Sequence, residues 1–259
     1  MLRLVALCVL GLTLASGMPQ DAAAQRSSPA QTGETFRLAP QRPGETDIYI
    51  LSFGLWGPQS VFDSEARGAA RILETTFGSK DRSIVRANTK RRAGASAATL
   101  MAAANAVGAV LDPVDDVAVL VLTSHGGPQG IGLVTQREQG VMTPRDVGRL
   151  LDATRARYRV LIVSACYSGV FASALADPRT LVITAAAADR SSFGCQDGAT
   201  WTYFGDAFFN RSLRSEPRLD AAFAKARTLV TEREKRERFE PSNPQIAGGA
   251  LVLEHLSKR

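Results

Sequence analysis

DVAVLVLTSHGG at residues 116–127 and YRVLIVSACYSG at residues 158–169 are the two stretches that decide the fold. Each contains a predicted strand, 116–123 and 158–164, whose middle is continuously apolar, without the alternation of a strand that has one solvated face. Continuous apolar runs of this length are typical of strands buried on both faces, as in a parallel sheet. The segment between them is long enough for a crossover helix, so we expect the two strands to run parallel.

The same pattern extends over the rest of the chain. Further strands are predicted at 47–53, 83–87 and 181–185, and helices at 62–77, 95–111, 143–155, 201–213 and 218–238. Strands that alternate with helices favour an α/β fold with a mostly parallel central sheet, covered by helices.

Chemically reactive side chains follow both buried runs. His125 comes just after the first run and Cys166 just after the second. Because the carboxyl ends of neighbouring parallel strands meet at one edge of a sheet, we expect the two side chains to lie close together. An imidazole beside a thiol can take up its proton and later protonate a leaving amine. The spacing therefore predicts a nucleophilic cysteine with a histidine base.

The neighbours of these two residues suit the same chemistry. Gly126 lets the backbone approach a substrate closely, and its N–H together with that of Cys166 is predicted to stabilise an oxyanion. Cys166 is also expected to begin a helix, whose N-terminal dipole favours the thiolate. Two competing interpretations are a small buried hydrophobe at Cys166 and a structural disulfide to Cys195 that masks the thiol.

The first residues have the pattern of an export signal. A basic residue precedes a short apolar run over 4–15, and small residues follow up to Ala24. The run is too short to span a membrane as a helix. We predict a signal peptide over 1–24, a flexible leader over 25–45 and one folded domain over 46–259, with export as the destination and no membrane span after cleavage.

Several other functions are not expected from the composition. The densest basic segment, 80–92, lacks the interleaved aromatic residues that stack on bases, so nucleic-acid binding is not predicted. The few histidines and cysteines lack the spacing of metal ligands. GGPQG at 126–130 has no lysine and does not match a phosphate-binding loop. We therefore predict an enzyme without a metal or cofactor; the residues make no prediction about oligomeric state.

Four motifs in order resemble the legumain family of cysteine peptidases, which belongs to the caspase-like clan. They are His125-Gly126, Ala165-Cys166, TAAAADRSSFGC at 184–195 and TYFGD at 202–206. The resemblance extends over residues 46–250 and implies a caspase-like three-layer α/β/α sandwich that acts on a protein or peptide substrate. It implies Cys166 as nucleophile, His125 as base and Gly126 as an oxyanion donor. The chain resembles bacterial members of the family in particular, which favours a periplasmic location.

The resemblance also implies a pocket for the side chain that precedes the scissile bond, near Ser191, Ser192 and Asp206. Ser164 belongs to the same pocket, where the eukaryotic enzymes carry an acidic residue, and Gln59-Ser60-Val61-Phe62 stands where they carry an Arg-His pair. Those groups hold an asparagine side chain, and a site that loses such hydrogen-bonding groups loses much of its discrimination. The pocket is therefore not expected to select asparagine.

Two further points follow from the resemblance. The family keeps a cysteine at the position of Cys195 without a bond to the nucleophile, which favours a free, partly buried thiol there. The family also includes the catalytic subunit of a transamidase, so transpeptidation by the same residues is an alternative to hydrolysis. A binding module that keeps the fold without catalysis is the other alternative.

Overall fold

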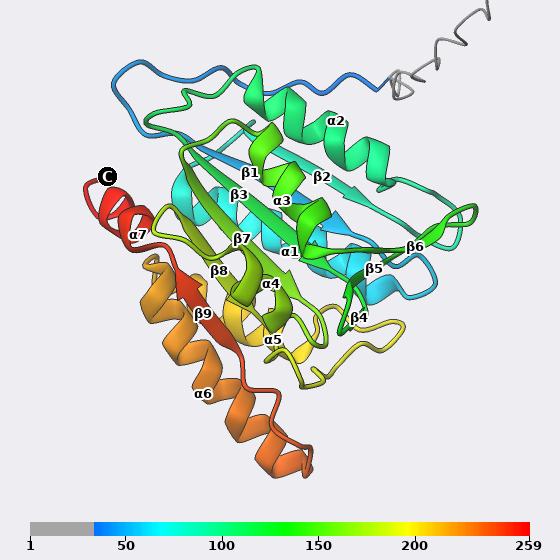
Figure 1. The fold of residues 1–259 in the computed structure, drawn as a ribbon. Helices are drawn as coiled ribbons and strands as arrows, with labels where there is room; N and C mark the ends of the chain where they lie inside the picture. The colour runs from blue at the N-terminus through cyan, green and yellow to red at the C-terminus, as the bar shows by residue number, and fades with distance from the viewer. Residues whose placement is uncertain (1–33) are drawn as a thin grey trace, which may run out of the picture. The chain divides into compact units, whose positions relative to one another are not determined.

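The structure, a computed structural model, describes residues 34–259, and a sheet of six strands forms their centre (Figure 1). In spatial order the strands are β2 (Ser83–Ala87), β1 (Ile48–Gly54), β3 (Val117–Thr123), β7 (Tyr158–Ser164), β8 (Thr180–Thr184) and β9 (Gln245–Gly248). The strands from β2 to β8 pair in parallel, and β9 pairs antiparallel with β8.

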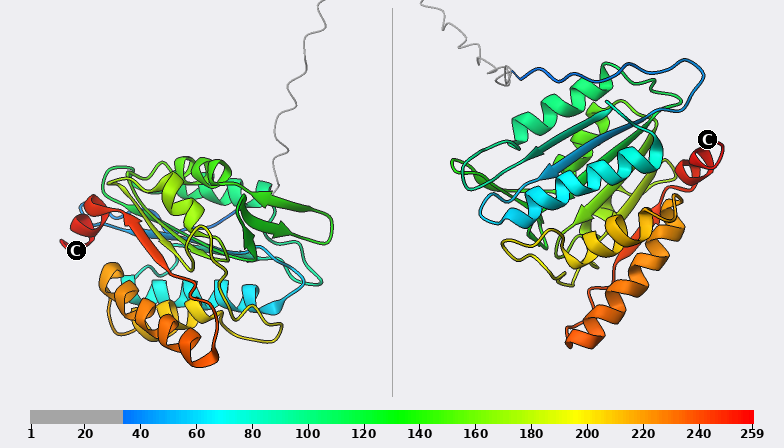
Figure 2. Two further views of the ribbon diagram at one scale, coloured as in Figure 1. Left: turned by 60° about the horizontal axis from the view of Figure 1, so that its bottom comes forward. Right: turned by 180° about the vertical axis from the view of Figure 1, so that it is seen from behind.

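Two sets of helices cover the sheet, as the left view of Figure 2 shows. One face carries α1 (Ser60–Phe77), α5 (Tyr203–Gly205), the π-helix η1 (Asp206–Leu213), α6 (Leu219–Glu237) and α7 (Ala250–Leu256). The other face carries α2 (Ala97–Gly108), α3 (Pro144–Ala153) and α4 (Gly169–Leu175). The predicted α/β class, with a mostly parallel sheet between helical layers, is confirmed.

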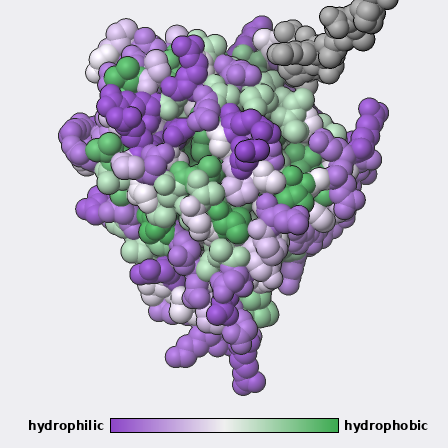
Figure 3. Space-filling view, in the orientation of Figure 1, coloured by the Kyte–Doolittle hydropathy of each residue, from purple (hydrophilic) through white to green (hydrophobic). Residues whose placement is uncertain are grey.

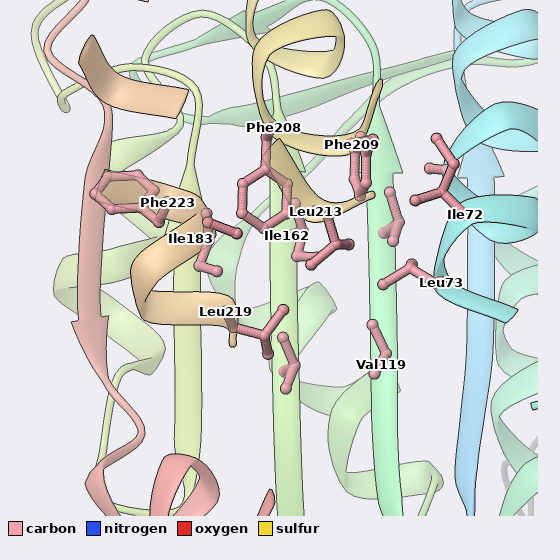
Figure 4. Packing of buried hydrophobic residues seen from close by; sticks show 14 of the residues in the cluster. Ile72, Leu73, Val119, Ile162, Ile183, Phe208, Phe209, Leu213, Leu219 and Phe223 are labelled. Atoms are coloured by element: carbon pink, nitrogen blue, oxygen red, sulfur yellow. The ribbon is translucent and has the colours of Figure 1, made fainter. Parts of the chain in front are cut away.

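Strand β3 shows why the apolar run in the sequence is continuous. Val119 and Val121 face the side of α1 and α6, whereas Leu120 and Leu122 face the side of α2 and α3. Successive side chains of a strand point to opposite faces, so a strand covered on both sides must be apolar at every position. Figure 4 shows the first of these cores, where Val119 lies in the same layer as side chains from β7, β8, η1 and α6.

A small antiparallel sheet follows His125 directly and was not predicted from the sequence. Its strands are β4 (Gly126–Gly127), β5 (Gly130–Val134) and β6 (Gln139–Met142), in that order. These segments are short and rich in glycine, a residue that is depleted in strands, so they lack a clear strand pattern. The short edge strand β9 was missed for the same reason.

The helix expected over 201–213 begins later and changes its geometry along its length. Thr202 caps α5, and its hydroxyl accepts a hydrogen bond from the Gly205 N–H at 2.9 Å. The chain then continues as the π-helix η1. π-helical turns are rare in proteins overall, but those that do occur are often found at functional sites.

Part of the predicted flexible leader lies against the folded body. Within residues 34–45, Phe36 and Leu38 pack against the core on the side of α2. Burial of these two apolar side chains outweighs the polar composition from which flexibility was predicted. The predicted signal peptide at 1–24 lies outside the described residues. Across residues 34–259, no helix combines the length and the apolar character needed to cross a membrane.

The outer surface is mixed in character. On the face that carries α2, α3 and α4, hydrophobic side chains form small separate patches among hydrophilic ones (Figure 3). Val114, before β3, and Val141, on β6, are large hydrophobic residues that are exposed to 52% and 50%. Val114 precedes the amino end of β3, whereas Val141 belongs to the small sheet that follows its carboxyl end.

The N-terminus of α3 offers a test of the local structure. The Thr143 hydroxyl accepts a hydrogen bond from the Asp146 N–H, and the Asp146 carboxylate accepts one from the Thr143 N–H at 2.9 Å. These two reciprocal hydrogen bonds form a capping box. We expect Thr143→Ala to lower the free energy of unfolding by about 1 kcal/mol, measured by urea denaturation. Thr75→Ala, the same change at an exposed position inside α1, is the control and should shift stability by less than about 0.5 kcal/mol. Equal effects of the two changes would contradict the capping role.

Candidate active site

The candidate site lies where the chain direction across the sheet reverses. From β1 the chain moves outward to β2, and from β3 it moves in the opposite direction through β7 to β8. In open α/β sheets, ligands bind beyond the carboxyl ends of the strands at this switch point. The loops that follow β1, β3, β7 and β8 all contribute residues to the site described below.

The structure brings His125 and Cys166 to the same edge of the sheet. Thr123, the last residue of β3, pairs with Ser164, the last residue of β7, so the two reactive residues occupy equivalent places after paired strands. Gly126 packs directly on the backbone of Cys166, and a Cβ atom at this position would overlap the Cys166 carbonyl oxygen. Only glycine allows this close approach between the two loops.

Cys166 occupies a sharp turn rather than the start of a helix. Tyr167 has a left-handed φ of 56°, and its N–H donates to the Arg190 carbonyl oxygen at 2.7 Å. This conformation is costly for a residue other than glycine, and it interrupts helical geometry directly after the cysteine. Helix α4 therefore begins at Gly169, and our expectation that Cys166 starts the helix is wrong.

The Cys166 thiol is held by the segment after β8. Its sulfur accepts from the Ser192 N–H at 3.2 Å and donates to the Ser192 carbonyl oxygen at 3.3 Å. Among the described residues, these two backbone groups are the hydrogen-bond partners of the thiol. Ser192 thus touches the predicted nucleophile through its backbone rather than through its hydroxyl.

His125 is oriented by Gln59, which follows β1. The imidazole Nε2 is hydrogen-bonded to Gln59 Oε1, and Gln59 Nε2 donates to the Cys195 carbonyl oxygen at 2.7 Å. Because the amide nitrogen of Gln59 is committed as a donor, its oxygen must accept from His125, which assigns the proton to Nε2. The Nδ1 atom is then free to accept a proton.

Two aromatic side chains enclose the imidazole. The ring centroids of Trp56 and Phe62 lie 4.8 Å and 5.1 Å from that of His125, both in edge-on geometry. Burial lowers the pKa of His125 below its ordinary value of 6.5 because it disfavours the charged ring. The imidazole is therefore neutral at neutral pH, the state that a general base requires.

In the sequence, Gln59 is notable only because it lies where a basic pair is missing. Its position after β1, which pairs with β3, was the available signal, since the loops after neighbouring parallel strands meet. Nothing in the local sequence marks a glutamine as the partner of a histidine. The pairing becomes visible only in three dimensions.

The four predicted pocket residues occupy different environments. Ser191 is exposed and Ser192 is buried, both beside Cys166 in the segment after β8. Ser164 is buried, and its hydroxyl lies 3.1 Å from Thr202 Oγ1 inside the protein. Asp206 opens η1, and its carboxylate accepts from Asn210 Nδ2 at 2.8 Å within the same helix.

A buried carboxyl group, Glu65 of α1, lies beneath the ends of β3 and β7. It accepts from Thr123 Oγ1 at 2.7 Å and from the Thr202 N–H at 2.8 Å. Gly205 leaves the room for it, because a Cβ atom there would overlap the carboxylate. Burial raises the pKa of Glu65, since the charged form loses its hydration, while hydrogen bonds from its neighbours oppose the shift.

Cys195 is a free, half-buried thiol close to this group. Burial, together with smaller effects of negative charge on Cys166 and Glu65, raises the pKa of Cys195 to about 12. The thiolate is the reactive form of cysteine, so Cys195 is unreactive at neutral pH. Cys166 is also free, and neither cysteine is in a disulfide.

The loop after Cys195 is tied to the start of α1. The Asp197 carboxylate accepts from the Ser60 N–H at 2.9 Å and from Lys90 Nζ at 2.6 Å. This distant carboxylate satisfies a free N–H in the first turn of α1, where negative charge is favourable. The contact fixes the Cys195 backbone, on which Gln59 depends for its own orientation.

The fold and the placement of the site at the carboxyl ends of β3 and β7 define a caspase-like α/β protein. Caspase-1 from Spodoptera frugiperda has a similar structure, with a TM-score of 0.55, 11% sequence identity, and coverage of 83% of this chain and 94% of that chain. The model of the peptidase C13 family matches residues 96–250. The chain therefore belongs to the peptidase C13 family of cysteine peptidases. No curated protein matches the sequence.

The residues that the family match covers differ from those that complete the site. The matched segment contains His125 and Cys166, whereas Gln59 and Glu65 lie before it on the chain. The parts of the site that orient the histidine and join the strand ends thus come from the loop after β1 and from α1.

The raised pKa of Glu65 gives a test of its burial. Because its native pKa lies above the ordinary value of 4.5, the native state binds this proton more tightly than the unfolded chain does. Stability from this group is present at low pH and is lost as the pH rises through the native pKa. We therefore expect wild type to gain stability over Glu65→Gln as the pH falls from neutral toward 4.5, measured by urea unfolding at several pH values.

The control for this comparison is Glu232→Gln, the same chemical change at an exposed position of α6. A difference between wild type and Glu65→Gln that stays constant over the whole pH range would show that Glu65 takes up no proton in the native state.

Proposed function

We propose that the protein is a cysteine endopeptidase in which Cys166 is the nucleophile and His125 is the general base. The observation that carries the proposal is the placement of both residues directly after paired strands, with Gly126 packed on the Cys166 backbone. Membership of the peptidase C13 family and the caspase-like fold support the same chemistry. The apolar run at 4–15 supports export, and we propose that the enzyme acts outside the cytoplasm, in the periplasm of a bacterium.

In the first half of the reaction, His125 Nδ1 takes the proton from the Cys166 thiol. The thiolate sulfur then attacks the carbonyl carbon of the scissile peptide bond and a tetrahedral oxyanion forms. As the carbon–nitrogen bond breaks, the imidazolium returns its proton to the leaving amine. The first product departs with a free amino group, and the other half of the substrate remains bound to Cys166 as a thioester.

In the second half, water attacks the thioester while His125 Nδ1 accepts one of its protons. The carbon–sulfur bond breaks, the new carboxyl group leaves, and the proton returns to the sulfur of Cys166. Gln59 holds the ring through Nε2 in both halves, so that Nδ1 alone exchanges protons. If an amine replaced water in this half, the product would be a new peptide bond, which is the transamidase alternative.

We propose that two backbone N–H groups, those of Gly126 and Cys166, stabilise the oxyanion. The Gly132 N–H donates to the His125 carbonyl oxygen at 2.8 Å. Gly132 of β5 and His125, just before β4, therefore form a hydrogen-bonded cross-strand pair. Pairs alternate along antiparallel strands, so the Gly126 N–H is directed away from β5. The Cys166 N–H has no acceptor among the residues that the structure describes. Both groups therefore support an oxyanion hole.

The pocket for the residue before the scissile bond is proposed not to select asparagine. Ser164 directs its hydroxyl to Thr202 inside the protein, and Asp206 is engaged by Asn210. Gln59, in the region where the eukaryotic enzymes carry a basic pair, is used to hold His125. These contacts leave few side-chain groups to bind a carboxamide, so we propose that Ser191 and Ser192 border a small polar pocket of different specificity.

Cleavage of a peptide library by the mature protein tests the nucleophile. We expect wild type to cleave under reducing conditions. The rate of Cys166→Ala should be lower by a factor of at least about 1,000, because covalent catalysis requires the sulfur. Cys195→Ala, a change at the second thiol, is the control and should keep the activity. Cleavage by Cys166→Ala at the wild-type rate, or no cleavage by wild type, would rule out the proposal. Added amines in the same assay distinguish ligation from hydrolysis by the mass of the products.

The lowered pKa of His125 makes a prediction about the pH profile. A general base must be neutral, so activity is lost as the pH falls through the His125 pKa, below the ordinary value of 6.5. Trp56→Ala removes a ring that shields the imidazole from water, and we expect it to move the acidic limb of kcat/KM to higher pH. The alkaline limb of the same profile is the internal control. An acidic limb that stays in place would show that Trp56 does not desolvate His125.

A further inference from the structure

The small sheet β4–β6 and the loop after β1 enclose a groove beside His125. The groove has a volume of about 400 Å³, and its walls include Trp56, Pro128 and Val141 together with His125 itself. Apart from the imidazole, no side chain that lines it carries a titratable group. A volume in the range of ~300–1,000 Å³ is typical of pockets that bury whole ligands, so one large side chain fits easily.

The geometry of the groove is fixed by glycines. Gly132 of β5 lies under the Trp56 ring, and a Cβ atom there would approach the indole to 3.0 Å. Trp56 is held in turn by a bridge to Val134, so the indole lies over β5 and forms one wall. Gly130 has a φ of 146°, which lets the chain turn into β5 tightly beside β6. The groove is therefore a built feature of the backbone and not a gap left by mobile side chains.

The position of His125 decides which part of a substrate this groove faces. In the proposed reaction the imidazole must lie within hydrogen-bonding reach of the leaving amine. The residue that carries this amine is the first residue after the scissile bond. Because His125 lines the groove, the side chain of that residue lies next to the groove when the amine lies next to the imidazole.

We propose that this groove is a specificity subsite for an apolar side chain on the first residue after the scissile bond. This inference rests on the proposed function, because it uses His125 as the acid that protonates the leaving amine. Val141, half exposed at the outer wall, is uncovered apolar surface that such a side chain would bury. A carboxylate or ammonium group placed there would lose hydration without a partner of opposite charge, so acidic and basic residues are disfavoured.

The test uses peptides that share the residues before the cut and differ only in the residue after it, which is leucine, aspartate or lysine. Pairs compete in one reaction, so the product ratio gives the ratio of kcat/KM. For wild type we expect leucine to be preferred over either charged residue by about tenfold or more. For Val141→Asp we expect this preference to fall by about tenfold, with lysine gaining over aspartate.

Val114→Asp is the matched control, because Val114 is exposed to 52%, as Val141 is to 50%, and precedes β3 instead of following it. It should keep the wild-type ratios. Both substitutions are at exposed positions, and circular dichroism checks that each variant is folded. A second variant, Val141→Thr, keeps the shape of the wall and should reduce the leucine preference by a smaller factor.

The outcomes separate the subsite from the catalytic proposal. Wild-type cleavage that depends on Cys166 but is indifferent to the residue after the cut would overturn the subsite and leave the dyad in place. Unchanged ratios in Val141→Asp, or the same change in Val114→Asp, would do so as well. No cleavage by wild type, or cleavage that survives in Cys166→Ala, would overturn both.

Discussion

The buried carboxyl group of Glu65 is the constraint on which the rest of the site depends. It joins three separate parts of the chain, since it belongs to α1 and binds Thr123 at the end of β3 and Thr202 before α5. Hydrogen bonds in a water-free interior are strong, and an unpaired carboxyl group there is costly, so the network has one favourable arrangement. The ends of β3 and β7, which His125 and Cys166 follow, are thereby held together. The same network explains why Gly205 and Ser164 are small.

The groups above this network are fixed by backbone contacts more than by side chains. Ser192 holds the thiol through its N–H and carbonyl oxygen, and Cys195 holds Gln59 through its carbonyl oxygen. Both contacts come from one segment after β8, which Asp197 ties to the start of α1. A single loop therefore orients the Cys166 thiol on one side and Gln59, the partner of His125, on the other.

Two sides of the proposed active site differ in how they are built. The side of Ser191 and Ser192 is formed by a loop on the main sheet, with polar groups engaged inside the protein. The side of Trp56 and Val141 is formed by the small sheet β4–β6, with apolar walls and glycines at the points of closest approach. Under the proposed function, the first side binds the residues before the scissile bond and the second binds the leaving part.

The sequence by itself determined the parallel strands of the main sheet, the major helices and the residues at the ends of these strands. Continuously apolar strands are buried on both faces of a parallel sheet. The residues that follow them, His125 and Cys166, therefore lie at the carboxyl edge of that sheet. Only the tertiary structure decided the partners of these residues. Gln59 meets His125, and Glu65 meets Thr123, across long stretches of chain for which no local pattern exists, because a hydrogen bond between distant residues leaves no periodicity in the sequence. The small sheet escaped prediction for a related reason: its glycines are needed for close approach to Trp56 and Cys166, and close approach is a property of the folded backbone alone.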